Sequence, residues 1–190
     1  ANPEKSNFNY FSEISFFDFK KILRGGKGLL FLKTRWKIVR AISRIMLKKY
    51  GGDPRLFVKE AKNKFSLLVP KIAKELPSFN DVAYYKGRKV YFLKRAQILT
   101  ADIWGAFCGR GMGRFSDLDY LTAFPDYKLP QILKHWGILK YAPALEKKIL
   151  SRGLIVHGSE EEVEIRGATV LAVERLKECL KELGVEKTSV

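Results

Sequence analysis

The sequence predicts a mostly α-helical protein, a helical bundle with one small β-hairpin near residues 82–92. Apolar residues recur at helical spacing through most of the chain, and glycines or prolines stand where these segments end. The stretch Asp81–Phe92 instead alternates with a period of two around the turn dipeptide Lys86–Gly87. A length of 190 residues fits one domain, residues 1–190, and we find no internal repeat.

Local signals place the helices along the chain. The long amphipathic segment 29–49 ends at Gly51–Gly52, and Asp53–Pro54 supplies a cap and a first-turn proline for the next helix. In chain order, we expect helices over residues 16–24, 29–49, 55–76 (with Pro70 as a kink or break), 93–107, 130–139, 143–150 and 166–183. A lone hairpin is marginally stable in water, so the hairpin must pack against these helices.

The remaining segments carry weaker signals. Residues 160–167 suggest a short extended piece, and Ser116 or Asp117 is expected to cap a short helix that ends at Leu121. Residues 1–9 and 185–190 are expected to be loose tails.

Composition and charge limit the classes of function. The chain is 46% hydrophobic, enough for a real core, and its net charge of +16 favours an anionic partner such as a nucleotide or a nucleic acid. Surface lysines that only solubilise the protein would give the same charge. No apolar run approaches the ~20 residues that span a bilayer, so we expect no membrane partner. Reduced thiols are the default for the two cysteines and the polar N-terminus has no apolar signal-peptide segment, so we expect a cytoplasmic location. Two cysteines without a CxxC spacing and two distant histidines argue against a zinc site, and we expect neither a metal nor a cofactor.

Most of the chemistry-bearing residues gather in the stretch 91–131, and Trp136 follows shortly after it. A carboxylate in a partly dry pocket can stabilise an oxocarbenium-like sugar or activate water, which is what cleavage of a glycosidic bond requires. Basic side chains can hold a phosphate, and aromatic faces can stack on a base. The residues that supply this set are Lys94, Arg95, Asp117, Asp126, Trp104, Phe124, Tyr127 and Trp136. The glycine-spaced segment 109–113 does not follow a strand, so it is interpreted as a flexible loop and not as a dinucleotide fingerprint.

Three segments resemble the queuosine salvage proteins: 77–104 (PSFNDVAYYKGRKVYFLKRAQILTADIW), 115–145 (FSDLDYLTAFPDYKLPQILKHWGILKYAPAL) and 162–174 (EVEIRGATVLAVE). The similarity is collinear from about Tyr10 to Leu183. It implies a mostly helical fold like that of the helix–hairpin–helix DNA glycosylases. It also implies hydrolysis of the N-glycosidic bond of queuosine 5′-monophosphate, which releases queuine and ribose 5-phosphate without a metal.

The resemblance also suggests roles for individual residues. Asp126, in the DY segment before a helix, is the expected catalytic carboxylate, and Asp117 is the second choice. Lys94 and Lys128 would hold the phosphate or orient the carboxylate. The full set of expected substrate-binding residues is Lys94, Arg95, Gln97, Phe124, Tyr127, Lys128 and Trp104. Glu162, Glu164 and Arg166 match the EVEIR motif, where a structural ion pair is the favoured interpretation.

Two departures keep alternatives open. Family members usually carry a longer N-terminal portion and a further C-terminal segment, so a partner segment or a second copy could complete the pocket. The strong positive charge also suits a related DNA or RNA base glycosylase, with an extruded base stacked on Trp104 or Phe124. A third hypothesis is a non-catalytic helical module that binds nucleic acid.

Overall fold

The computed structural model describes residues 7–23, 29–185 and 187. Within these residues the protein is mostly helical with one two-stranded antiparallel hairpin, so the predicted fold class is confirmed. The helices are α1 (Phe8–Glu13), α2 (Phe16–Ile22), α3 (Leu32–Tyr50), α4 (Pro54–Lys59), α5 (Phe65–Glu75), α6 (Lys94–Ala106), α7 (Leu129–His135), α8 (Pro143–Leu150) and α9 (Glu160–Glu182). The strands are β1 (Val82–Tyr85) and β2 (Arg88–Tyr91).

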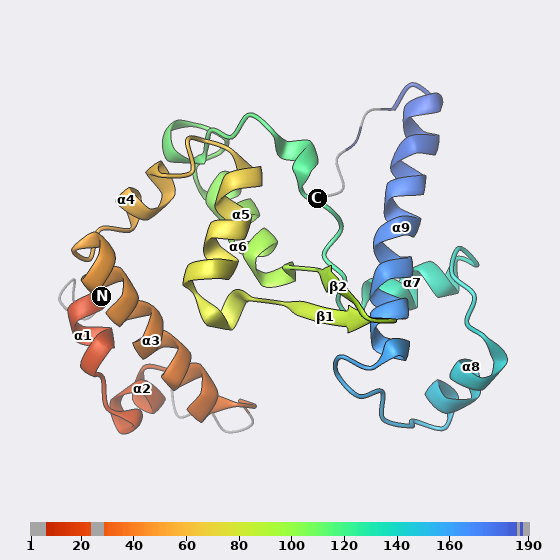
Figure 1. The fold of residues 1–190 in the computed structure, drawn as a ribbon, viewed down its shortest axis with the longest axis horizontal. Coiled ribbons are helices and arrows are strands. Elements are labelled where there is room, and N and C mark those ends of the chain that lie inside the picture. Colours follow the sequence, from red (N-terminus) through yellow and green to blue (C-terminus); the bar gives the residue numbers. More distant parts are fainter. Residues whose placement is uncertain (1–6, 24–28, 186, 188–190) are drawn as a thin grey trace.

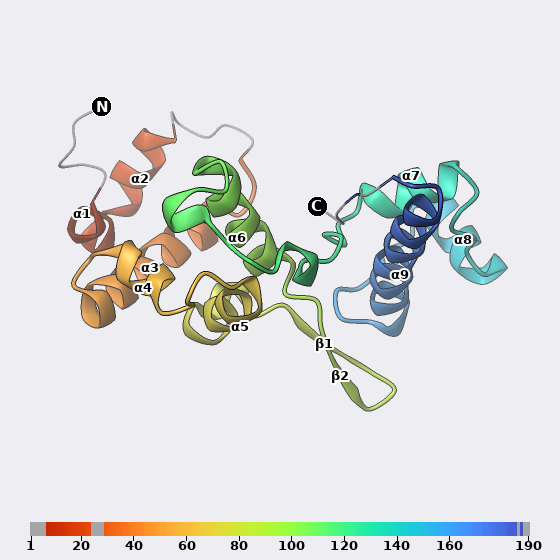
Figure 2. The same ribbon diagram turned by 90° about the horizontal axis from the view of Figure 1, so that it is seen from above.

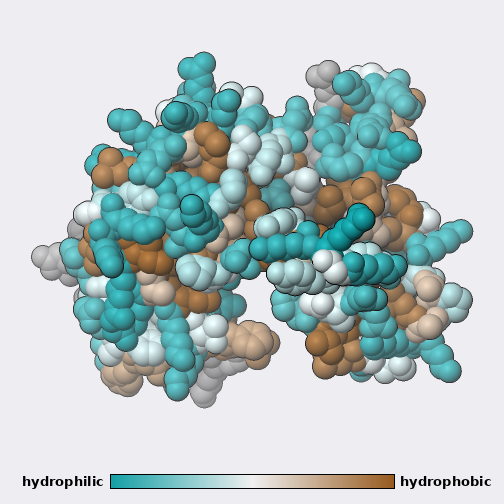
Figure 3. Space-filling model, in the orientation of Figure 1, coloured by the Kyte–Doolittle hydropathy of each residue, from teal (hydrophilic) through white to brown (hydrophobic). Residues whose placement is uncertain are grey.

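The elements form two parts joined by the hairpin and by the segment that follows α6. Figure 1 and the view from above in Figure 2 place α1–α6 on one side and α7–α9 on the other. In the space-filling view a notch separates the two parts next to the hairpin (Figure 3). The side chains that the sequence predicts to be functional come from both parts.

Helix α5 forms the centre of the larger part. Its residues Phe65, Leu68 and Ile72 are completely buried, because the apolar positions of this helix face α3, α4 and α6 at once. Phe65 also stacks on Phe115, with the ring centroids 4.2 Å apart. The position of α5 therefore determines where α6 lies, and α6 carries the KRAQ segment in its first turn.

A polar cluster ties α3 and α4 to α5. The Lys71 ammonium donates to the Tyr50 hydroxyl at 2.7 Å and to carboxylates of Glu75 and Glu60. Burial disfavours the charged form of Glu75, but hydrogen bonds from Lys71, Lys49 and Tyr50 outweigh it and lower the pKa of Glu75 to about 2. The cluster is therefore an ion pair network that stabilises the folded state at neutral pH.

The hairpin packs against α9, as the instability of a lone hairpin required. Val82 pairs with Tyr91 and Ala83 pairs with Val90, and Ala83 and Phe92 bury against Val163 of α9. The turn residues Lys86 and Gly87 both have positive φ values, 46° and 77°, which suits a two-residue hairpin turn.

Three predictions about local structure are wrong. Residues 160–167 are not extended: they are the first two turns of α9, because the Ser159 hydroxyl accepts the Glu162 amide as an N-cap. Segment 55–76 is two helices, since the chain turns through the positive φ of Lys62 and Asn63. Of the two alternatives expected at Pro70, the break is wrong, because Pro70 lies inside α5.

The N-terminal tail was also only partly predicted. Residues 1–6 of the expected N-terminal tail lie outside the described residues, but residues 8 and 9 belong to α1, which Asn7 caps through the Tyr10 amide. The short helix that was expected to end at Leu121, with Ser116 or Asp117 as its cap, is a single 3₁₀ turn, Leu118–Tyr120, without a side-chain cap.

Candidate active site

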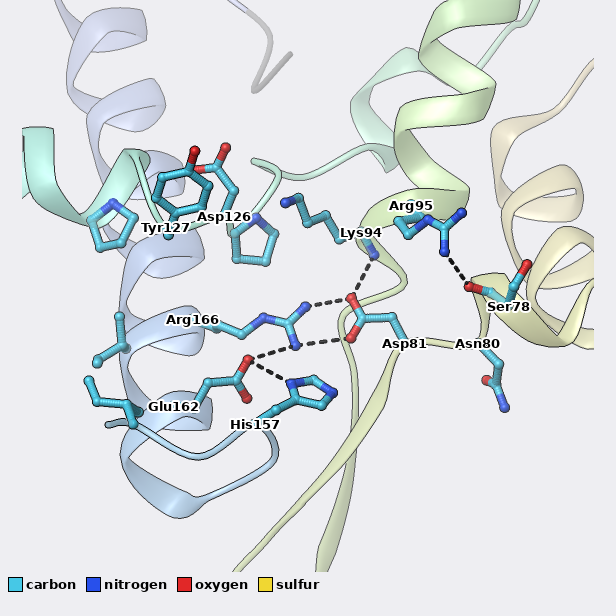
Figure 4. A pocket seen from close by; sticks show the side chains of 14 residues that line it. Ser78, Asn80, Asp81, Lys94, Arg95, Asp126, Tyr127, His157, Glu162 and Arg166 are labelled. Carbon is cyan, nitrogen blue, oxygen red and sulfur yellow. Dashed lines mark hydrogen bonds and ion pairs between the residues drawn. The ribbon is translucent and has the colours of Figure 1, made fainter. Parts of the chain in front are cut away.

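A cavity of about 580 Å³ lies between the two parts. One wall comes from the segment before β1 and from the first turn of α6, and the other from the start of α7 and from α9 with the loop before it. The lining residues are Ser78, Asn80, Asp81, Lys94, Arg95, Pro125, Asp126, Tyr127, Pro130, Ile155, His157, Glu162, Ile165 and Arg166. Figure 4 shows how these side chains converge. A cavity of this size suits a small molecule.

Asp126 lies at the edge of this cavity, just before α7. Its Oδ1 accepts the backbone N–H groups of Lys128 at 2.8 Å and of Leu129 at 2.9 Å. These two bonds fix the carboxylate, because the unpaired amides at the start of a helix need an acceptor. Within the described residues no hydrogen bond or ion pair engages Oδ2. Asp126 therefore offers one free, charged oxygen.

Lys94 and Arg95 approach the cavity from α6. Figure 4 shows the Lys94 side chain directed toward the wall that carries Asp126. No carboxylate in the described part of the chain pairs with its ammonium. The Arg95 guanidinium is more restrained, since it donates to the Ser78 carbonyl at 2.9 Å and lies 4.7 Å from the centre of the Phe79 ring. Together they place two positive charges at one end of the cavity.

The neighbours of Asp126 divide between two surfaces. Tyr127 lines the cavity with a side chain that is largely exposed, and the Lys128 ammonium lies 5.5 Å above its ring. Phe124 and Lys128 instead line a second, smaller groove between α7 and α9, which Asp126 also borders. Phe124 and Lys128 are thus near the candidate carboxylate but outside the main cavity.

Three further expected site residues, Asp117, Gln97 and Trp104, also lie away from the cavity. The Asp117 carboxylate accepts hydrogen bonds from the backbone N–H groups of Phe65 at 2.6 Å and of Ser66 at 3.0 Å. It therefore caps α5, although it lies 52 and 51 residues later in the chain than these partners. Gln97 is buried: its side-chain NH₂ donates to the Phe92 carbonyl, and its side-chain oxygen accepts a hydrogen bond from the Thr122 backbone N–H. Trp104 lies near the end of α6, next to the glycine loop.

Asp117 and Gln97 hold backbone in place. Burial would raise the pKa of Asp117, but hydrogen bonds from Ser66 and Phe65 outweigh it and lower that pKa, which fits a helix cap. Gln97 attaches the segment after Leu121 to α6, and this segment leads to Asp126. Their contribution to the site is therefore structural support.

Comparison with known proteins identifies the family. A sequence model described as "Queuosine salvage protein" matches residues 2–190. The chain belongs to the queuosine salvage protein family. The resemblance of the KRAQ, LTAFPDY and EVEIR segments is thereby confirmed.

Three relatives of this queuosine salvage chain carry the name queuosine 5′-phosphate N-glycosylase/hydrolase. The protein from Sphaerobacter thermophilus is 43% identical over 93% of this chain and 54% of its own length. That from Dictyostelium discoideum is 40% identical over 80% of this chain and 48% of its own. That from Bos taurus is 35% identical over 94% of this chain and 53% of its own. The chain spans about half the length of the curated relatives it matches. None of these names refers to a nucleic-acid glycosylase.

One feature of the cavity, a hydrogen-bond network around Arg166, was not predicted from the sequence. The guanidinium makes two hydrogen bonds to Asp81 and a longer one of 3.4 Å to Glu162, whose Oε1 also lies 3.3 Å from His157. The EVEIR motif indicated that Glu162 and Arg166 could pair, and they do. Asp81 precedes the hairpin, and no local spacing could have shown that it meets a residue 85 positions later.

Two further findings concern other classes of function. In the described part of the chain, no cluster of three or more histidine, cysteine or acidic side chains could bind a metal ion. Among the same residues, no helix is both long and apolar enough to cross a bilayer.

Proposed function

We propose that this protein hydrolyses the N-glycosidic bond of queuosine 5′-monophosphate and releases queuine and ribose 5-phosphate. The names of the relatives from Sphaerobacter, Dictyostelium and cattle support the reaction and the substrate. The cavity supports it independently, because it combines a free carboxylate oxygen, two cations and apolar surface.

One observation carries the proposal. The cavity has three carboxylates, Asp81, Asp126 and Glu162. Both oxygens of Asp81 are engaged by Arg166. The two oxygens of Glu162 accept hydrogen bonds from Arg166 and from the Gly158 amide. Of these three described carboxylates, Asp126 alone keeps an oxygen without a protein partner. This oxygen is available to a substrate, so Asp126 is the proposed catalytic residue.

The reaction needs one negative charge at the sugar. As the bond between C1′ and the base nitrogen breaks, its electron pair goes to the base and positive charge develops on the ribose. The Asp126 carboxylate stabilises this charge and accepts a proton from the water that adds to C1′. The base takes up a proton and leaves as queuine. Because two backbone amides hold Oδ1, the carboxylate does not need to reorient during the step.

The two ends of the cavity suggest how the nucleotide lies. Lys94 and Arg95 form a cationic end, where an ammonium and a guanidinium can hold the 5′-phosphate. Pro125, Ile155 and Ile165 provide apolar surface at the wall of α7 and α9, where the flat base can lie. The ribose then lies between these ends, next to Asp126.

The test is release of queuine from queuosine 5′-monophosphate, followed by chromatography. Asp126→Asn keeps a carbonyl oxygen for the Lys128 and Leu129 amides but removes the charge, so we expect turnover to fall by at least about 100-fold with little change in folding. Asp119→Asn is the matched control, since Asp119 is an exposed acid on the preceding 3₁₀ turn. If Asp126→Asn turns over at the rate of the wild-type protein, the proposed role of Asp126 is wrong. If the wild-type protein releases no queuine, the proposed function is wrong.

A further inference from the structure

The ion pair between Asp81 and Arg166 is the most buried charged contact of the cavity. The Arg166 and Asp81 side chains are only 9% and 17% exposed, and the guanidinium bonds both carboxylate oxygens. The central carbon of the guanidinium also lies 3.9 Å from the centre of the Phe92 ring. Burial would raise the pKa of Asp81, but the contacts of Arg166 outweigh it and the pKa is lowered, so Asp81 is charged. Burying two charges is costly, and such pairs are weak sources of stability.

On the side of the larger part, Asp81 holds the start of α6. Its Oδ2 accepts the backbone N–H of Lys94 at 3.1 Å, and its carbonyl accepts the amides of Phe92 and Leu93. Leu93 occupies the cap position in the left-handed conformation, with φ of 48°, and has no capping side chain of its own. Asp81 therefore performs the capping that Leu93 cannot, and this fixes where the Lys94 side chain begins.

On the side of the smaller part, Arg166 belongs to α9. Helix α9 packs against α7, and the first amides of α7 hold Asp126. Through Glu162 the same guanidinium also reaches the loop that carries His157 (Figure 4). The pair of Asp81 and Arg166, called the clamp below, thus connects the wall that carries Lys94 to the wall that carries Asp126.

We propose that Asp81 and Arg166 are positioning residues, whose clamp sets the separation of Lys94 and Asp126 across the cavity. This inference rests on the proposed glycosidase function. Lys94 and Asp126 belong to different parts of the fold and do not touch, so a substrate must bridge them. A displacement of about 1 Å between such groups can cost about 100-fold in rate.

The test is a double-mutant cycle with Arg166→Lys, measured as kcat/KM for queuosine 5′-monophosphate. Lysine keeps the charge but cannot make the two parallel hydrogen bonds. If the clamp acts by placing Lys94, Arg166→Lys lowers kcat/KM about 10- to 100-fold in the wild-type background but less than about twofold in Lys94→Met. Equal losses in both backgrounds would show a merely structural role and overturn the proposal. Asp81→Asn replaces Arg166→Lys if the latter does not fold.

A second measurement does not depend on turnover. Hydrogen exchange of the Lys94 amide, read by NMR, should become at least about tenfold faster in Arg166→Lys, because Asp81 is then less restrained as its acceptor. An unchanged exchange rate would overturn the clamp. Tyr85→Phe is the matched control, because it removes a different contact between the hairpin and α9, the hydrogen bond from the Tyr85 hydroxyl to Glu164. This variant should leave kcat/KM unchanged. Lack of turnover by the wild type refutes the proposed function instead, and with it the positioning role.

Discussion

Replacing Asp117 by alanine should destabilise the protein although Asp117 lies outside the cavity. Its carboxylate accepts the Phe65 amide at 2.6 Å, the Ser66 amide at 3.0 Å and the Ser66 hydroxyl at 2.6 Å. Hydrogen bonds to a charged group contribute about 1.5–3 kcal/mol each, and loss of a helix cap costs about 0.5–2 kcal/mol. The three bonds share one partly exposed carboxylate and do not add fully, so we expect a loss of about 2–4 kcal/mol.

Urea denaturation followed by circular dichroism measures this loss. In thermal unfolding of a chain of this size, the same loss of about 3 kcal/mol lowers Tm by roughly 6–12 °C. Asp119→Ala, an exposed acid two residues further along, is the control and should remain within about 0.5 kcal/mol of wild type. If Asp117→Ala unfolds at the wild-type urea midpoint, or if it abolishes turnover without affecting stability, the capping role is refuted.

Two further predictions concern the larger part. The pKa of Glu75 is lowered from its usual 4.5 to about 2, so its stabilisation is present above pH 4.5 and is lost as pH falls toward 2. The lowered pKa stabilises the folded state by about 3 kcal/mol at neutral pH. Acid titration of the unfolding free energy should therefore show a shallower fall in Glu75→Gln than in the wild type. Gly113→Ala would bring a new Cβ to 2.6 Å from the Phe107 Cβ, which should cost about 1–3 kcal/mol in urea denaturation. At Gly105 nothing lies within 4 Å, so Gly105→Ala in α6 should be neutral or stabilising, and an equal cost at both positions would contradict the steric argument.

Local patterns were sufficient for most elements of the fold. The alternation around Lys86–Gly87 predicts the hairpin, because a period of two and a turn dipeptide are properties of neighbouring residues. The same holds for α8, whose first residue is Pro143 as expected. The start of α9 was mispredicted, although the Ser159 cap and the three glutamates of the first turn both indicate the start of a helix.

The candidate site was only partly accessible from the sequence. The KRAQ and DYK motifs led to Lys94, Arg95, Asp126 and Tyr127, and all four line the cavity. The same motifs also contain Gln97, which supports backbone instead. A motif records which residues occur together, and it does not separate those that contact a ligand from those that hold the contacting residues in place.

By itself, the sequence determined the helical class, the hairpin and the family, because each follows from local periodicity or from a collinear pattern of residues. Only the tertiary structure decided which acid does what. Asp117 caps α5 across 52 positions, Asp81 pairs with Arg166 across 85, and Asp126 keeps a free oxygen. The physical reason is that the role of a carboxylate depends on the donors that surround it, and here the decisive donors come from distant parts of the chain.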